Sequence, residues 1–133
     1  NLGTVFGGKI MSGIDIGAAT SAGRHSRRPA VTASMDDLHF LAPIKAGYVV
    51  VLRSQVVYAG RTSMEVEVLV DAEDPTTGAR TRCCTAWLTF VALDDSGRPT
   101  EVPGLVPVTA EEKAAYDEAE RRRGLRLKRR VGL

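Results

Sequence analysis

The residues Gly7-Gly8-Lys9-Ile10-Met11-Ser12-Gly13-Ile14-Asp15-Ile16-Gly17-Ala18-Ala19 predict a helix that has an apolar face and carries one carboxylate. Between residues 7 and 22 the only charged side chains are Lys9 and Asp15. Six apolar residues recur at spacings of three and four: Ile10, Met11, Ile14, Ala18, Ala19 and Ala22. This pattern is typical of a helix that packs against a core, and we expect it to run from Gly7 to Ser26.

Asp15 stands out within this helix, because it follows Met11 by four residues and precedes Ala18 by three. We therefore expect its carboxylate to lie within the apolar face. Burying a carboxylate costs several kcal/mol unless it is paired or hydrogen-bonded. Two explanations fit about equally well: the acid serves chemistry or a specific partner, or it is a structural residue bonded to the backbone or to another chain.

The composition is that of a single globular domain. The chain has 133 residues, of which 44% are hydrophobic and 26% charged. It contains no apolar run long enough to span a bilayer and no visible signal or transit peptide, so we expect a cytoplasmic protein without a membrane partner. The adjacent Cys83 and Cys84 and the two histidines, His25 and His39, do not form a metal-ligand pattern. This argues against a zinc or iron enzyme.

The charges are distributed unevenly along the chain. Seven of the 18 basic residues lie between Arg121 and Arg130, a range without acidic residues. Such a segment is either a solvated helix face or a surface for a phosphorylated ligand, a membrane or nucleic acid. Because no aromatic residues are interleaved for base stacking, we do not expect nucleic-acid binding.

The remaining sequence predicts four strands and a second helix. The strands are expected at 30–40, 48–58, 63–72 and 80–93, joined by turns at 59–62 and 74–78. In the third strand apolar residues alternate with Glu65, Glu67 and Asp71, which predicts one buried and one polar side. Thr109 and Glu112 form a capping box that opens a helix through about Arg123 or beyond. Residues 1–5 could supply part of a further strand before the first helix.

This order predicts an α+β fold in which a curved antiparallel sheet wraps one long apolar helix. We expect residues 1–108 to form this domain and residues 109–133 to form a basic C-terminal helix and tail. Long antiparallel strands leave exposed edges, and pairing across a two-fold axis covers them, so we expect at least a dimer.

Several motifs resemble the hotdog-fold acyl-CoA thioesterases, in particular the bacterial short- and medium-chain hydrolases and the cytosolic brain-type hydrolases of animals. The motifs cover nearly the whole chain: residues 5–11 with Ile14-Asp15, then 31–36, 40–44 with Gly47, 63–68 and 105–107. The Gly-Gly pair followed seven residues later by Asp is the more specific of these motifs. The pattern from Phe40 through Pro43 to Gly47 is common among hotdog proteins.

The resemblance implies hydrolysis of acyl-CoA thioesters to free fatty acid and coenzyme A, without a metal or redox cofactor. It makes Asp15 the general base or the nucleophile, and the sequence does not separate these two routes. Gly7 and Gly8 would precede the helix and offer free backbone N–H groups as an oxyanion hole, or they would only form the entry turn. Asn1 stands one residue closer to this pair than the family's active-site Asn, so its role stays open.

Further expectations concern the substrate and the assembly. Gly8 and Asp15 are seven residues apart, about 10 Å along a helix, which is too far for both to contact one carbonyl. We therefore expect a site shared between two subunits. Because coenzyme A carries phosphates, residues of the first hairpin turn and of the strand after the helix are candidates for substrate binding: Arg61, Thr62, Ser63, Thr32 and Ser34.

The expected assembly is a homodimer and, by resemblance, a homohexamer built as a trimer of dimers. The alternative function is a non-catalytic acyl-CoA-binding hotdog module that acts as a sensor or regulator. Acyl-chain length is not predicted.

Overall fold

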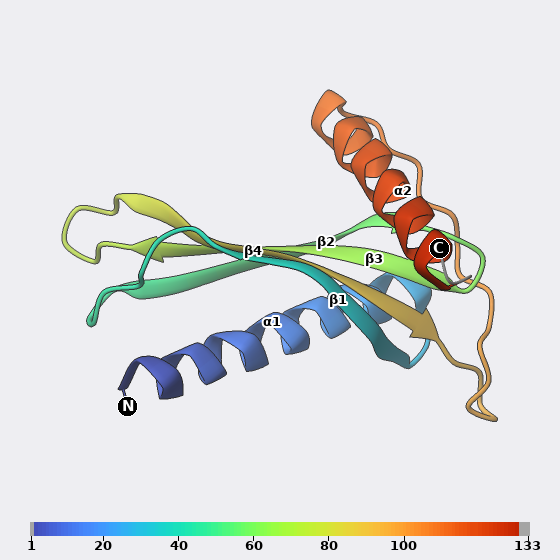
Figure 1. Ribbon diagram of the computed structural model, residues 1–133, viewed down its shortest axis with the longest axis horizontal. Coiled ribbons are helices and arrows are strands. Elements are labelled where there is room, and N and C mark those ends of the chain that lie inside the picture. The colour runs from blue at the N-terminus through green and yellow to red at the C-terminus, as the bar shows by residue number, and fades with distance from the viewer. Residues whose placement is uncertain (1, 131–133) are drawn as a thin grey trace.

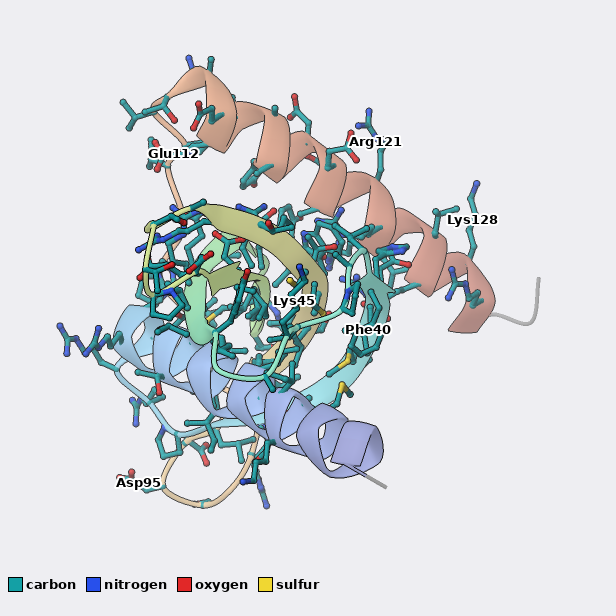
Figure 2. All side chains as sticks on the ribbon, turned by 90° about the vertical axis from the view of Figure 1, so that its left-hand side faces the viewer. Phe40, Lys45, Asp95, Glu112, Arg121 and Lys128 are labelled. Atoms are coloured by element: carbon teal, nitrogen blue, oxygen red, sulfur yellow. The ribbon has the colours of Figure 1, made fainter. Side chains whose placement is uncertain are left out.

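The computed structural model describes the backbone of residues 2–130 and the side chains of residues 7–129. The elements follow the chain in this order: α1 (Leu2–Ser26), β1 (Ala30–Phe40), β2 (Val49–Ala59), β3 (Ser63–Glu73), β4 (Arg80–Ala92) and α2 (Ala110–Arg130). The four strands form one twisted sheet, α1 runs along one side of it, and α2 lies on the other side (Figure 1). Figure 2, turned by 90°, also places the strands between the two helices. The α+β prediction is confirmed.

All strand pairs are antiparallel, and their order across the sheet is β1-β4-β3-β2. The predicted strands are confirmed to within one residue at each end, and both predicted hairpins join neighbouring strands. The suggestion of a strand within residues 1–5 is wrong for residues 2–5, because they belong to α1. Asn1 lies outside the described residues.

The core lies between α1 and the sheet. Ile10, Ile14, Ala18 and Ala22 are spaced by four residues on one side of α1, and all are buried. They pack against alternate residues of the two central strands: Met64, Val66, Val68, Val70, Cys84, Ala86, Leu88, Phe90 and Ala92. Residues spaced by four lie on one face of a helix and residues spaced by two on one face of a strand, so the sequence predicted the parts of this core that come from α1 and β3.

The opposite face of the sheet is partly covered by α2. The capping box is confirmed, since the Glu112 N–H donates to Thr109 Oγ1 at 3.0 Å and the Thr109 N–H donates to Glu112 Oε1 at 2.9 Å. We expected a polar, solvent-facing side on β3, but Glu65 is 1% exposed and Asp71 6% exposed. The alternation was correct, but Arg122 covers Glu65 from α2 and Arg82 reaches Asp71 from β4.

Candidate active site

A direct hydrogen bond joins the carboxylate of α1 to the strand that follows it. Thr32 Oγ1 on β1 donates to Asp15 Oδ1 at 3.0 Å. Thr32 stands opposite Phe90 in the β1–β4 ladder, and Phe90 belongs to the core against α1. Because residues paired across an antiparallel ladder share a face, Thr32 also faces α1. The structure thus brings together two residues that the sequence nominated for different roles.

Asp15 is exposed within the single chain, contrary to the expectation that it lies inside the apolar face. The buried face consists of residues spaced by four, and Asp15 follows Ile14 by one residue. One residue turns a helix by about 100°, so Asp15 points to the side of this face. Its neighbour Ile16 is 65% exposed.

Gly7 and Gly8 lie inside α1, which starts at Leu2, and the expectation that they precede the helix is wrong. In a helix interior each N–H bonds to a carbonyl one turn earlier, so these groups are not free to bind an oxyanion. Each glycine weakens a helix by about 1 kcal/mol, but the stretch contains no proline that would end it. Both positions have open space where a Cβ would lie.

Thr32 and Ser34 do not lie on the same face, although they are two residues apart. The ladder is irregular between them, and Ser34 stands opposite Thr89 rather than beside the core residues. Thr89 in turn pairs with Glu65, whose side chain contacts α2. A β-bulge reverses the alternation of side chains, so Ser34 faces α2 while Thr32 faces Asp15.

The hairpin turn between β2 and β3 borders a basic pocket of about 200 Å³ on the α2 side of the sheet. Thr62 and Ser63 line it, as do Arg123 and Arg126 of α2. The other lining residues are Ala33, Thr89, Val91 and Leu127. Arg61 is an exposed neighbour of this pocket in the same turn. The turn and the basic helix, which the sequence treated as separate candidates, therefore meet in space.

A buried ionic cluster on the same side of the sheet was missed by the sequence analysis. Arg122 Nε donates to Glu65 Oε1 at 2.6 Å, and Arg126 Nη1 donates to Asp36 Oδ2 at 2.8 Å and to Glu65 Oε2 at 3.3 Å. The Arg122 guanidinium also lies 4.7 Å from the ring centre of Trp87. The basic run in α2 was a signal, because the rest of the chain carries more acidic than basic residues.

Burial raises the pKa of Glu65, and the hydrogen bonds and positive charges of Arg122 and Arg126 act against this increase. In the part of the chain that the structure describes, no group of three or more His, Cys, Asp or Glu side chains could hold a metal ion. Neither helix, within its described residues, is long and apolar enough to cross a membrane.

Sequence comparison relates this chain to acyl-CoA hydrolases. The sequence profile of the thioesterase superfamily matches residues 2–79. An uncharacterised acyl-CoA thioester hydrolase of Bacillus subtilis is 48% identical over 98% of this chain and 76% of its own length. The cytosolic acyl coenzyme A thioester hydrolase of Homo sapiens is 39% identical over 90% of this chain, which spans only 32% of that protein.

Solved structures give the same relationship. An acyl-CoA hydrolase from Staphylococcus aureus, in complex with butyryl coenzyme A, coenzyme A and coenzyme A disulfide, has a TM-score of 0.87 and 42% identity over 94% of this chain and 76% of that one. An apo-hexameric acyl-CoA thioesterase has a TM-score of 0.92 and 43% identity over 100% of this chain and 85% of that one. The chain therefore belongs to the thioesterase superfamily, within the group of hotdog-fold acyl-CoA thioester hydrolases.

Proposed function

We propose that this protein hydrolyses acyl-CoA thioesters to a fatty acid and coenzyme A, and that Asp15 is its catalytic acid–base residue or nucleophile. The observation that carries the assignment is the 3.0 Å hydrogen bond from Thr32 to Asp15. A hydroxyl that donates to a carboxylate holds the orientation of that carboxylate. An oriented carboxylate oxygen is what either route to thioester cleavage needs.

The spacing of these residues supports the assignment. Solved structures of the Staphylococcus aureus hydrolase include variants in which an Asp, a Thr or an Asn is replaced by Ala. The replaced Asp and Thr are 17 residues apart in that chain, as are Asp15 and Thr32 here. The replaced Asn stands one residue farther from the Asp than Asn1 stands from Asp15. This comparison supports Thr32 more strongly than Asn1.

Two routes are open to Asp15. As general base it accepts a proton from water while the water oxygen attacks the thioester carbonyl, and the C–S bond then breaks to release the thiolate of coenzyme A. As nucleophile its carboxylate oxygen attacks the carbonyl and expels the thiolate, and water hydrolyses the resulting anhydride. Both routes create an oxyanion that needs hydrogen-bond donors. Because Gly7 and Gly8 lie inside α1, we do not assign that role to their N–H groups in this conformation.

We propose that a second copy of the chain completes the site. Asp15 and Thr32 are both exposed in the single chain, and Ile16, the neighbour of Asp15 on α1, is an apolar residue that is 65% exposed. Exposed apolar side chains around a reactive pair are expected where another subunit excludes water. Related thioesterases are described as hexameric, which supports a homo-oligomer here.

We place the phosphates of coenzyme A at the basic pocket formed by the β2–β3 turn and α2. Thr62 and Ser63 offer hydroxyl donors, and Arg61, Arg123 and Arg126 offer guanidinium groups near a phosphate held there. The reaction requires neither a metal nor a redox cofactor in this proposal. Since the mammalian relatives are named cytosolic, we also propose a cytosolic location.

A thiol-release assay across acyl-CoA chain lengths tests this function. We expect turnover of one or more acyl-CoA substrates, and we expect Asp15→Asn to lower kcat by about 100-fold or more, because a positioned acid–base group contributes that much. Asp117→Asn, an exposed carboxylate on α2, is the matched control and should leave kcat unchanged. Tight acyl-CoA binding without turnover in the wild type would favour the sensor alternative. Full activity of Asp15→Asn would remove Asp15 from the mechanism.

A further inference from the structure

Strand β1 contains two irregularities close together, and both affect where Thr32 points. The β1–β4 ladder is interrupted between Thr32 and Ser34 and again between Met35 and Asp37. Without them, strict alternation would place Thr32, Ser34 and Asp36 on one face. With them, Thr32 and Met35 face α1, while Ser34 and Asp36 face α2.

The position of these bulges decides which side chains of β1 face α1 and which face α2. A shift of one residue in the ladder turns every side chain to the other face. If the bulge next to Ser34 moved by one residue, Ala33 would take the place of Thr32 opposite Phe90 and would face Asp15 with a methyl group. The hydrogen bond at the proposed active site therefore depends on the exact location of the bulges.

The buried ionic cluster contacts this stretch of β1 at one residue, Asp36. Asp36 falls within the second irregularity and has no partner in the ladder. Its Oδ2 accepts a hydrogen bond from Arg126 Nη1 at 2.8 Å and one from Thr89 Oγ1 at 3.5 Å. Arg126 is in turn held by Glu65, which is 1% exposed and is also bound by Arg122. The α2 helix thus reaches the irregular part of β1 through one guanidinium.

We propose that Arg126 is a positioning residue for the thioesterase reaction, because its ion pairs with Asp36 and Glu65 hold β1 in the bulged register that turns Thr32 toward Asp15. A largely buried charge without its partner is strongly destabilising, so any register that moves Asp36 away from Arg126 is disfavoured. Buried polar groups are known to select one register over another in this way. This inference rests on the proposed role of Asp15 and Thr32.

A double-mutant cycle separates this role from a general loss of stability. Thr32→Val should lower kcat by about 100-fold, the effect of losing one positioned donor. Arg126→Met should lower kcat by about tenfold or more while Thr32 is present, since small misplacements of reacting groups have effects of this size. In the double variant kcat should fall no further than in Thr32→Val alone, because Arg126 acts through Thr32. If the two reductions in kcat multiply in the double variant, the proposal is overturned.

Arg126 also lines the basic pocket, so two measurements distinguish a role in phosphate binding from a role in positioning. Loss of a phosphate contact raises KM for acyl-CoA, whereas loss of positioning lowers kcat. Acyl-pantetheine has no phosphates, so a kcat defect of Arg126→Met that persists with this substrate supports positioning. Asp36→Asn should reproduce the kcat defect from the β1 side, and Arg126→Lys should restore part of the activity.

The control variants lie on the same helix and the same sheet. Arg121 lies on the side of α2 that faces away from the sheet (Figure 2), and it pairs only with Glu118 among the described residues. Arg82 binds the buried Asp71 at 2.5 Å beyond Cys84, the last partner of β1 in β4. Arg121→Met and Arg82→Met should keep kcat, although the second variant also loses a buried ion pair. A loss of kcat in Arg82→Met as large as that in Arg126→Met would contradict the proposal. A fully active Thr32→Val would contradict the proposed function instead.

Discussion

Burial and two arginines shift the pKa of the Glu65 carboxylate in opposite directions. Its side chain is 1% exposed, and both of its oxygens accept hydrogen bonds from guanidinium groups of α2. Burial has the larger effect, so the pKa of Glu65 is raised above its ordinary value of 4.5. The folded state therefore binds this proton more tightly than the unfolded state does. Between 4.5 and the raised pKa, the contribution of Glu65 to stability falls as pH increases.

Loss of Arg122 should make this pH dependence steeper. Without that guanidinium the pKa of Glu65 rises further. Ionising Glu65 in the folded state then costs more free energy, and the loss of stability grows as pH increases. We expect Arg122→Met to destabilise the protein by about 3 kcal/mol near pH 8, the cost of breaking a buried pair, and by clearly less near pH 5. Urea denaturation at both pH values measures the difference. Arg121→Met is the control, and an equal destabilisation of Arg122→Met at both pH values would contradict the expectation.

At the level of single residues, the sequence nominated Asp15 and Thr32 as site candidates but did not predict their environment. Asp15 was recognised because a charge in an otherwise apolar helix is unusual. Its exposure was not predicted, because a spacing of three or four residues does not separate the centre of a helix face from its border. The opposite faces of Thr32 and Ser34 were not predicted, because a bulge leaves no mark on the alternation pattern of one strand.

Among the elements, α2 has the clearest local signal in the sequence. Thr109 and Glu112 cap its first turn, and the backbone N–H of Thr109 keeps the pKa of Glu112 below its ordinary value of 4.5. This contribution is present above pH 4.5 and is lost as pH falls through the lowered pKa. The cap starts the helix that carries the ionic cluster to the sheet.

Removal of this cap should loosen the start of α2. Thr109→Ala should cost about 1 kcal/mol, the usual effect of losing a threonine cap. The loss should appear as faster hydrogen exchange of the amides at 111–113 and a lower midpoint of urea denaturation. Thr81→Ala, an exposed threonine in β4, serves as the comparison. Unchanged exchange at 111–113 would show that packing alone holds this turn.

The strands and the two hairpins could be predicted because alternation, turns and length are all local signals, whereas the pairing of β1 with β4 joins distant segments and was not predicted. The start of α1 could not be predicted in the same way. The glycine pair indicated an entry turn, but α1 continues through it to Leu2. Glycine permits both conformations at a modest cost, so the sequence around Gly7 and Gly8 does not decide between them.

For the whole molecule, the main unpartnered surface near the site combines α1 and β1. Ile16 is exposed beside Asp15, and Phe40 and Leu41, at and just after the end of β1, are 64% and 59% exposed. A second copy that covers this surface would bury apolar area and remove water from Asp15 together. Assembly and activity should therefore depend on the same residues.

A charged side chain at this surface should disrupt assembly and activity together. We expect Ile16→Glu to reduce the oligomer to smaller species, measured by light scattering during size-exclusion chromatography, and to reduce kcat in parallel. Thr81→Glu introduces the same charge at an exposed position in β4 and should affect neither. Monomers of Ile16→Glu with full activity would contradict a shared site. An intact oligomer would show that Ile16 lies outside the subunit contact.

The two adjacent thiols have a practical consequence for all of these measurements. Cys83 and Cys84 are each 1% exposed, and burial together with the neighbouring thiol raises the pKa of Cys84. Thiol reagents attack the thiolate and need access to it. The cysteines of the native chain should therefore not react while the reagent measures the coenzyme A that is released. Once the sheet opens, both sulfurs become reactive. The same reagent therefore reports turnover in the folded enzyme and unfolding in its variants, without an added label.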